Sequence, residues 1–194
     1  MKKVLLLGDS IRQGYQEYVK QELEGECEVY FDAEDNGRFV QYNFWQLNQM
    51  YKKYGNFDIV HFNSGYWDMT IEEPDREAMN SLSEYIVWLK RIINYVRNRK
   101  GIPIFANSAP IFDELTNTKN NTSPYIFHYK NSWVQKYNNV AERLMESEKV
   151  YVNNLYDLLI TGKKFYKCPD MLHLTEDGYK LVAKKIAMVI RKGL

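Results

Sequence analysis

The sequence predicts an α/β fold in which helices cover both faces of a parallel sheet. Three observations predict it. Short, continuous apolar runs recur along the chain, stretches with apolar residues at helical spacing separate them, and the apolar runs end in small or polar residues. Continuous apolar strands that alternate with amphipathic helices are typical of parallel sheets buried on both sides.

Five apolar runs are expected as strands. Each is too short for a helix, and turn residues follow most of them. The runs are "KVLLL" (3–7), "CEVYF" (27–31), "FDIVHF" (57–62), "IPIFAN" (102–107) and "KVYVNN" (149–154).

Five helices are expected between and after these strands. Pro74 stands at the favoured first turn of the longest one. The stretch 112–128 shows no regular pattern, and an irregular segment of that length inside a domain is usually functional or mobile. The expected helices span 11–23, 39–54, 74 to about 99, 129–146 and 175 to about 191.

Length and charge limit the function classes. The 194 residues suit one domain over 1–194. A formal net charge of +1 gives no electrostatic reason to expect a nucleic acid or an anionic membrane as partner. No run approaches the roughly 20 apolar residues that span a bilayer, and the run after "MKK" is too short for a signal peptide. We therefore expect a cytoplasmic protein, without an expectation for its oligomeric state.

The cysteines do not point to a metal site. Cys27 and Cys168 lie far apart and match no metal-ligand spacing, so each is expected as a free thiol. No metal and no cofactor are predicted. Of the histidines, His61 lies within an expected strand and is interpreted as structural, while His128 lies in the irregular stretch.

The ends of the expected strands carry polar residues that a ligand site would need. In open α/β sheets, ligands bind outside the carboxyl ends of the strands. The first strand ends in Gly8-Asp9-Ser10, and "DAEDNGRF", "NSGYWD" and "NSAP" follow or end the next three. Each segment alone is weak evidence, because turns favour the same residues. Together they predict one polar rim.

An aspartate precedes the third histidine by three residues. Asp170 and His173 lie in "CPDMLHLTEDGY", just before the last expected helix. A serine nucleophile needs a base, and the base needs a partner that fixes its tautomer. A carboxylate and an imidazole at this spacing can pair in a tight turn and leave the other ring nitrogen to face a serine. By itself, an Asp and a His at this spacing more often belong to a structural turn or a helix cap. They become evidence for a catalytic pair because Ser10 stands at the end of the first strand.

Four segments together resemble the SGNH, or GDSL, hydrolase family. They are "LLLGDSI", "NGRF" after the second strand, a Gly-containing turn that ends in Asp after the third strand, and "DMLHLTEDGYKLVA". The resemblance covers the whole chain in the family's order, and the first and last segments are specific together. It implies a flavodoxin-like, three-layer α/β/α sandwich. For it we predict a five-stranded parallel sheet of order 2-1-3-4-5 with right-handed crossovers.

The resemblance also implies roles for site residues. Ser10 is expected as the nucleophile, His173 as the base and Asp170 as the residue that orients it. The backbone N–H groups of Ser10 and Gly37 are expected in an oxyanion hole with an asparagine side chain from the third segment. Asn36, next to the glycine, is expected to contact the substrate.

The third segment departs from the family pattern of Gly-x-Asn-Asp. It reads Gly65-Tyr66-Trp67-Asp68, so Trp67 takes the place of the asparagine. The nearest amide is Asn63, and the segment is similar to a branch of the family with an Asn-x-Gly-x-His/Trp-Asp form. We expect Asn63 as the third oxyanion donor and Trp67 as a substrate contact. The rival interpretation is that Asn63 caps its turn and Trp67 lines the acyl pocket.

The implied activity is hydrolysis of esters through an acyl-enzyme. Small size and a polar, aromatic-rich rim favour short acyl groups, including acetyl esters on carbohydrates, although this step rests on analogy with the family. One alternative is an acyltransferase that uses the same triad with an alcohol in place of water. The other is a non-catalytic binding module on the same fold, against which the intact triad residues speak.

Overall fold

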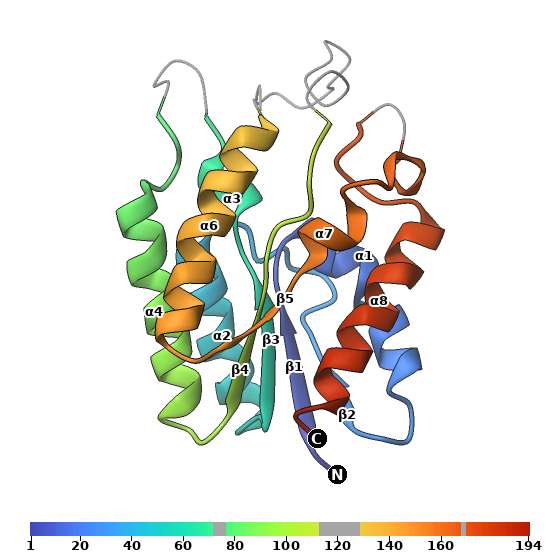
Figure 1. Ribbon diagram of the computed structural model, residues 1–194. Helices are drawn as coiled ribbons and strands as arrows, with labels where there is room; N and C mark the ends of the chain where they lie inside the picture. Colours follow the sequence, from blue (N-terminus) through green and yellow to red (C-terminus); the bar gives the residue numbers. More distant parts are fainter. Residues whose placement is uncertain (72–76, 113–128, 168–169) are drawn as a thin grey trace.

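A parallel sheet of five strands forms the centre of the molecule (Figure 1). The computed structural model describes residues 1–71, 77–112, 129–167 and 170–194. The strand order is β2-β1-β3-β4-β5, as predicted. The strands are β1 (Lys3–Leu7), β2 (Glu28–Tyr30), β3 (Ile59–Asn63), β4 (Ile102–Ala106) and β5 (Tyr151–Asn153).

Helices cover both faces of the sheet, which confirms the predicted α/β class. On one face α1 packs against α8, and on the other α2, α4 and α6 form a row (Figure 1). The long helices are α1 (Ser10–Glu22), α2 (Val40–Tyr54), α4 (Leu82–Arg97), α6 (Asn131–Ser147) and α8 (Glu176–Arg191). Shorter elements are α3 (Tyr66–Met69), α7 (Leu155–Leu159) and the 3₁₀ turn η1 (Lys163–Phe165).

The central strands are buried on both sides, which explains their continuous apolar runs. All of β3 is buried, and so is β1 from Val4 onward, whereas the edge strands β2 and β5 are partly exposed. The register aligns the carboxyl ends of the inner strands, because Leu7 pairs with Phe62 and Asn63 pairs with Ala106. Residues that follow β1, β3 and β4 therefore meet at the carboxyl-terminal end of the sheet.

Two details of the expected helices were wrong. The helix predicted from Pro74 begins at Leu82 instead, because Ser81 and Glu84 form a capping box that starts it there. The short helices α3 and α7 were not predicted, since four or five residues are too few for a helical period to show.

Several sequence-based interpretations concern single residues. Cys27 is a buried free thiol, while Cys168, His128 and segment 113–128 lie outside the described residues. In the described part of the chain, no helix combines the length and apolar character needed to cross a membrane.

Candidate active site

The junction of β1 and α1 places Ser10. The strand ends just before Gly8, and Ser10 is the first residue of the helix. Asp9 caps the helix, because its Oδ1 accepts the N–H of Ile11 at 2.9 Å. The Asp9 side chain is buried, and burial raises the pKa of its carboxyl, while the hydrogen bond from the Ile11 N–H acts the other way. A rigid apolar strand thus holds the serine at the carboxyl-terminal end of the sheet, where the ends of the inner strands lie side by side.

The structure brings Ser10, His173 and Asp170 together in one hydrogen-bonded chain. Ser10 Oγ lies 2.8 Å from His173 Nε2, and His173 Nδ1 lies 2.9 Å from Asp170 Oδ2. When Nδ1 carries the proton and donates it to the carboxylate, Nε2 is left as the acceptor for the serine proton. The serine and the histidine are 163 positions apart in sequence, so only the fold brings them into contact.

A tight turn fixes the relative position of Asp170 and His173. Asp170 Oδ1 accepts the N–H groups of Leu172 and His173, at 2.9 and 3.1 Å. The carbonyl of His173 in turn accepts the N–H of Lys167 at 2.7 Å. The imidazole is 34% exposed and the carboxylate 47%, so solvent or a substrate can reach the pair.

The predicted oxyanion donors differ in the hydrogen bonds they already make. As the first residue of α1, Ser10 has no acceptor for its N–H inside the helix. The Gly37 N–H donates to the Gly8 carbonyl at 2.9 Å, so binding an oxyanion would require it to leave or share that acceptor. Asn63 donates one Nδ2 hydrogen to the Ala106 carbonyl at 2.9 Å, and its amide carries a second. The oxyanion roles of all three residues stay predictions.

The two expected substrate contacts lie on different segments. Asn36 is half-buried on the loop between β2 and α2, where its Oδ1 accepts the N–H of Arg38 at 2.8 Å. Trp67 is half-buried in α3, just after β3. Their contact with a substrate also stays a prediction.

Asp68 ties three segments together in a way that the motif did not reveal. Its Oδ1 accepts the N–H of Val40 at 3.0 Å and an Nδ2 hydrogen of Asn80 at 2.7 Å, and its Oδ2 accepts the Ser64 hydroxyl at 2.7 Å. Burial raises the pKa of Asp68 to about 6. Because Val40 is the first residue of α2, this carboxyl fixes the start of that helix against the turn after β3.

His61 is buried in β3, and its contacts agree with a structural role. Its Nε2 lies 3.1 Å from Nδ2 of Asn153 in β5, a strand that β4 separates from β3. Burial lowers the pKa of the imidazole to about 3, so the ring is neutral at ordinary pH.

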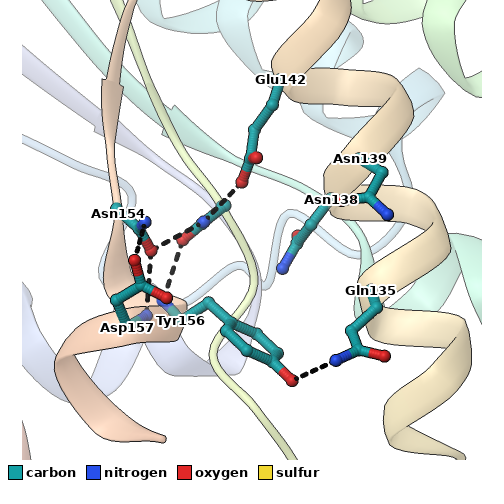
Figure 2. A pocket seen from close by; sticks show the side chains of 8 residues that line it. Gln135, Asn138, Asn139, Glu142, Asn154, Tyr156 and Asp157 are labelled. Atoms are coloured by element: carbon teal, nitrogen blue, oxygen red, sulfur yellow. Dashed lines mark hydrogen bonds between the residues drawn. The ribbon is translucent and has the colours of Figure 1, made fainter.

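A polar cavity of about 430 Å³ lies between α6 and α7 (Figure 2). Asn107 Oδ1 accepts the N–H of Leu155 at 2.7 Å, and its Nδ2 donates to Glu142 at 2.8 Å. Asn138 exchanges two hydrogen bonds of 2.9 Å with the backbone of Ser108. These side chains fasten α6 and α7 to the ends of β4 and β5. Neither here nor elsewhere in the described part of the chain do three His, Cys, Asp or Glu side chains gather to hold a metal ion.

Solved structures share this fold over nearly their whole length. A lipase/acylhydrolase from Enterococcus faecalis has a TM-score of 0.77 at 20% identity, covering 99% of this chain and 96% of its own. An acetyl xylan esterase has a TM-score of 0.76 at 14% identity, covering 97% and 99%. A GDSL-like lipase from Bacteroides thetaiotaomicron has a TM-score of 0.74 at 16% identity, covering 100% and 89%.

Sequence comparison gives no closer relation. Neither the models of known families nor the curated proteins match the sequence. The structural likeness therefore rests on backbone geometry at low identity, and it establishes the fold. The chain has the fold of SGNH/GDSL-type lipases and esterases.

Proposed function

We propose that the chain is a carboxylic ester hydrolase that works through Ser10, His173 and Asp170. The observation that supports this most directly is the pair of contacts of 2.8 Å and 2.9 Å that links the hydroxyl, the imidazole and the carboxylate. A nucleophile, a base and an orienting carboxylate in this order are what acyl transfer to serine requires. The fold shared with lipases and esterases supports the same reaction class.

The proposed reaction has two steps. In the first, Ser10 Oγ attacks the ester carbonyl carbon while His173 Nε2 takes the hydroxyl proton. The tetrahedral oxyanion then forms beside the Ser10 N–H and the second amide hydrogen of Asn63. As the ester bond breaks, Nε2 gives its proton to the leaving alcohol and an acyl-serine remains. In the second step a water molecule gives a proton to Nε2 and attacks the acyl carbon. Nε2 then returns that proton to Ser10 Oγ as the bond between Oγ and the acyl carbon breaks, which releases the acid and restores the free hydroxyl.

We further propose that the acyl group is short, with acetyl esters on carbohydrates as the first candidates. The segments that follow β1 and β3, Gly8-Asp9-Ser10 and Ser64-Gly65-Tyr66-Trp67-Asp68, are polar and aromatic. An acetyl xylan esterase is among the proteins that share the fold.

A panel of p-nitrophenyl esters, from acetyl to octanoyl, tests the activity and the acyl length, and acetylated xylo-oligosaccharides test the alcohol part. Wild type should hydrolyse the acetyl ester fastest, a fluorophosphonate probe should label Ser10, and Ser10→Ala should lose hydrolysis while it keeps its thermal melting curve. An added acceptor alcohol that diverts most of the acyl group from water would identify a transferase instead. Labelling of another residue, or activity retained in Ser10→Ala, would show the triad assignment to be wrong.

A further inference from the structure

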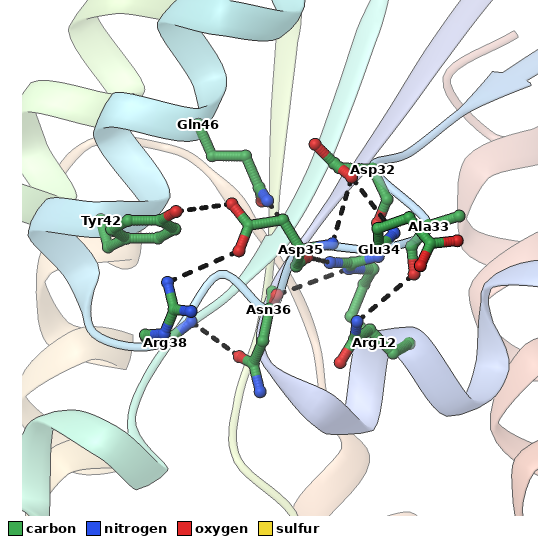
Figure 3. Close-up of polar contacts among 11 residues, drawn as sticks. Arg12, Asp32, Ala33, Glu34, Asp35, Asn36, Arg38, Tyr42 and Gln46 are labelled. Carbon is green, nitrogen blue, oxygen red and sulfur yellow. Dashed lines mark hydrogen bonds and ion pairs between the residues drawn. The ribbon is translucent and has the colours of Figure 1, made fainter.

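Arg12 is a fully buried cation two residues after Ser10. It lies in the first turn of α1, and its guanidinium donates to the loop that joins β2 to α2 (Figure 3). The acceptors of its N–H groups are the carbonyls of Gly8, Asp32 and Asp35 and the side-chain amide oxygen of Gln16.

The charge of Arg12 is matched by main-chain oxygens rather than by a direct ion pair. Its Nη1 and Nη2 each lie 2.5 Å from a carbonyl, those of Asp32 and Asp35, and among the described residues no carboxylate oxygen forms an ion pair with it. Burial lowers the pKa of the guanidinium, and the nearby Asp9, Asp32 and Asp35 carboxylates oppose that shift. A buried cation costs solvation free energy unless its hydrogen bonds are satisfied. Two of the acceptors that satisfy it, the Asp32 and Asp35 carbonyls, belong to the loop, so these bonds also fix the loop.

The loop that Arg12 holds carries two predicted site residues, Asn36 and Gly37. Asp35 directly precedes these two residues, and its carbonyl accepts a hydrogen bond from Arg12 Nη2. The same carbonyl also accepts one from Gln46 Nε2 of α2, at 3.2 Å. The loop is thus fixed between the nucleophile's own helix and the helix that follows the loop (Figure 3).

Arg12 and Gly37 share an acceptor at the end of β1. The Gly8 carbonyl accepts the Gly37 N–H at 2.9 Å and Arg12 Nε at 3.4 Å. A Cβ on Gly37 would lie 2.4 Å from that carbonyl oxygen and 2.4 Å from Asn43 Oδ1, so the loop backbone packs directly against the strand that delivers Ser10. A shift of the loop would therefore move Asn36 and Gly37 relative to the serine.

We propose that Arg12 is a positioning residue for the reaction at Ser10, holding the loop 32–38 so that Asn36 and Gly37 border the site. This inference rests on the proposed ester hydrolysis. Arg12 does not touch the reacting atoms and acts through the loop.

The test compares Arg12→Met and Arg12→Lys with wild type and with Arg191→Met. Arg191 is an exposed arginine that pairs with Glu26 at 2.7 Å, so the last variant removes an equal charge far from the loop. Two measurements are made on each protein that melts cooperatively. One is kcat and KM for p-nitrophenyl acetate, and the other is amide hydrogen exchange of peptides that cover 31–39 and, as reference, 59–63 and 179–190.

We expect kcat of Arg12→Met to fall about 10²-fold with KM changed less than about threefold, the effect of a displacement near 1 Å at a catalytic site. Exchange in 31–39 should speed up while the reference peptides keep their rates. Arg12→Lys should recover part of kcat, because one ammonium can reach one carbonyl but not both. Arg191→Met should match wild type in both measurements.

Three outcomes overturn the proposal. In the first, Arg12→Met is folded and keeps its kcat. In the second, exchange rises equally in the loop and in the reference peptides, which would show a general structural role. In the third, kcat falls while exchange in 31–39 is unchanged. If Arg12→Met does not fold, Arg12→Lys decides by the same criteria. If wild type itself hydrolyses no ester, the proposed function fails, whereas the exchange measurement still shows whether Arg12 holds the loop.

Discussion

The Asn63 amide lies at the end of β3 with one Nδ2 hydrogen bonded to the Ala106 carbonyl. If its second hydrogen binds the oxyanion, Asn63→Ala should lower kcat and kcat/KM together by about 10²–10³, with little change in KM. Loss of the buried bond should also cost about 0.5–2 kcal/mol of unfolding free energy. Trp67→Phe, as a pocket-wall change, should alter KM and acyl preference more than kcat. Steady-state kinetics beside thermal melts decide the matter: normal turnover by folded Asn63→Ala would assign the donor elsewhere.

The two oxygens of Asp170 have separate partners, which allows a sharp substitution. Oδ1 accepts two backbone N–H groups of the turn, and Oδ2 faces His173 Nδ1 at 2.9 Å. In Asp170→Asn the amide oxygen can keep the turn, while the amide N–H₂ favours the imidazole tautomer with its proton on Nε2, which cannot accept the Ser10 proton. We expect kcat to fall about 10⁴-fold with the melting temperature nearly unchanged. More than a tenth of wild-type kcat would contradict this role.

At the scale of single elements, α4 begins at a capping box rather than at a proline. Glu84 Oε2 accepts the Ser81 N–H at 2.9 Å, and Ser81 Oγ accepts the Glu84 N–H at 3.3 Å. Ser81→Ala should therefore cost about 1 kcal/mol, which is roughly 2–4 °C in melting temperature for a chain of this length. Activity at a temperature where the protein is folded should not change. Ser132→Ala, at an exposed position of α6, is the matched control and should melt like wild type.

At the scale of the whole molecule, two buried groups make stability depend on pH with opposite signs. The pKa of His61 is about 3 in the fold, below its usual 6.5, so the unfolded chain binds a proton there that the folded chain does not. Stability from this group is lost as pH falls from about 6.5 toward 3. The pKa of Asp68 is about 6, above its usual 3.8, so the folded chain binds the extra proton. Stability from Asp68 is present below about pH 3.8 and lost as pH rises through 6.

Asp68→Asn should remove the second of these effects. The amide oxygen can accept from Val40 and Asn80, and the amide N–H₂ can donate to Ser64 Oγ, so the contacts survive without the buried charge. The variant's unfolding free energy minus that of wild type should be about 2 kcal/mol larger at pH 7.5 than at pH 4, because only wild type carries the buried charge at pH 7.5. Urea unfolding at the two pH values measures this, with the exposed Asp177→Asn as control. An equal difference at both values would show that Asp68 keeps an ordinary titration in the fold.

The strand order was predicted from the resemblance to the SGNH family. The amino-acid sequence alone was enough to predict the α/β class and the polar residues at the carboxyl ends of the strands. These follow from local signals: apolar runs of strand length, helical spacing between them, and Gly8-Asp9-Ser10 at the end of a buried strand. The turn that pairs Asp170 with His173 is also local, because it spans three residues. Such features depend on neighbours close in the chain, so the chain's order reveals them.

Tertiary structure alone decided which distant polar groups meet and which are desolvated. Arg12 shares the buried face of α1 with Tyr15, Gln16 and Val19, a position that hinted at burial. Two of its acceptors, however, are loop carbonyls 20 and 23 residues away in the sequence. Asp68 likewise contacts Val40 only because the carboxyl end of β3 and the start of α2 lie at the same end of the sheet. Free energies of burial depend on every group packed around a side chain, and most of those groups are remote in sequence. For that reason Ser10 and His173 could be predicted from sequence motifs, whereas the contacts of Arg12 and Asp68 were found only in the folded structure.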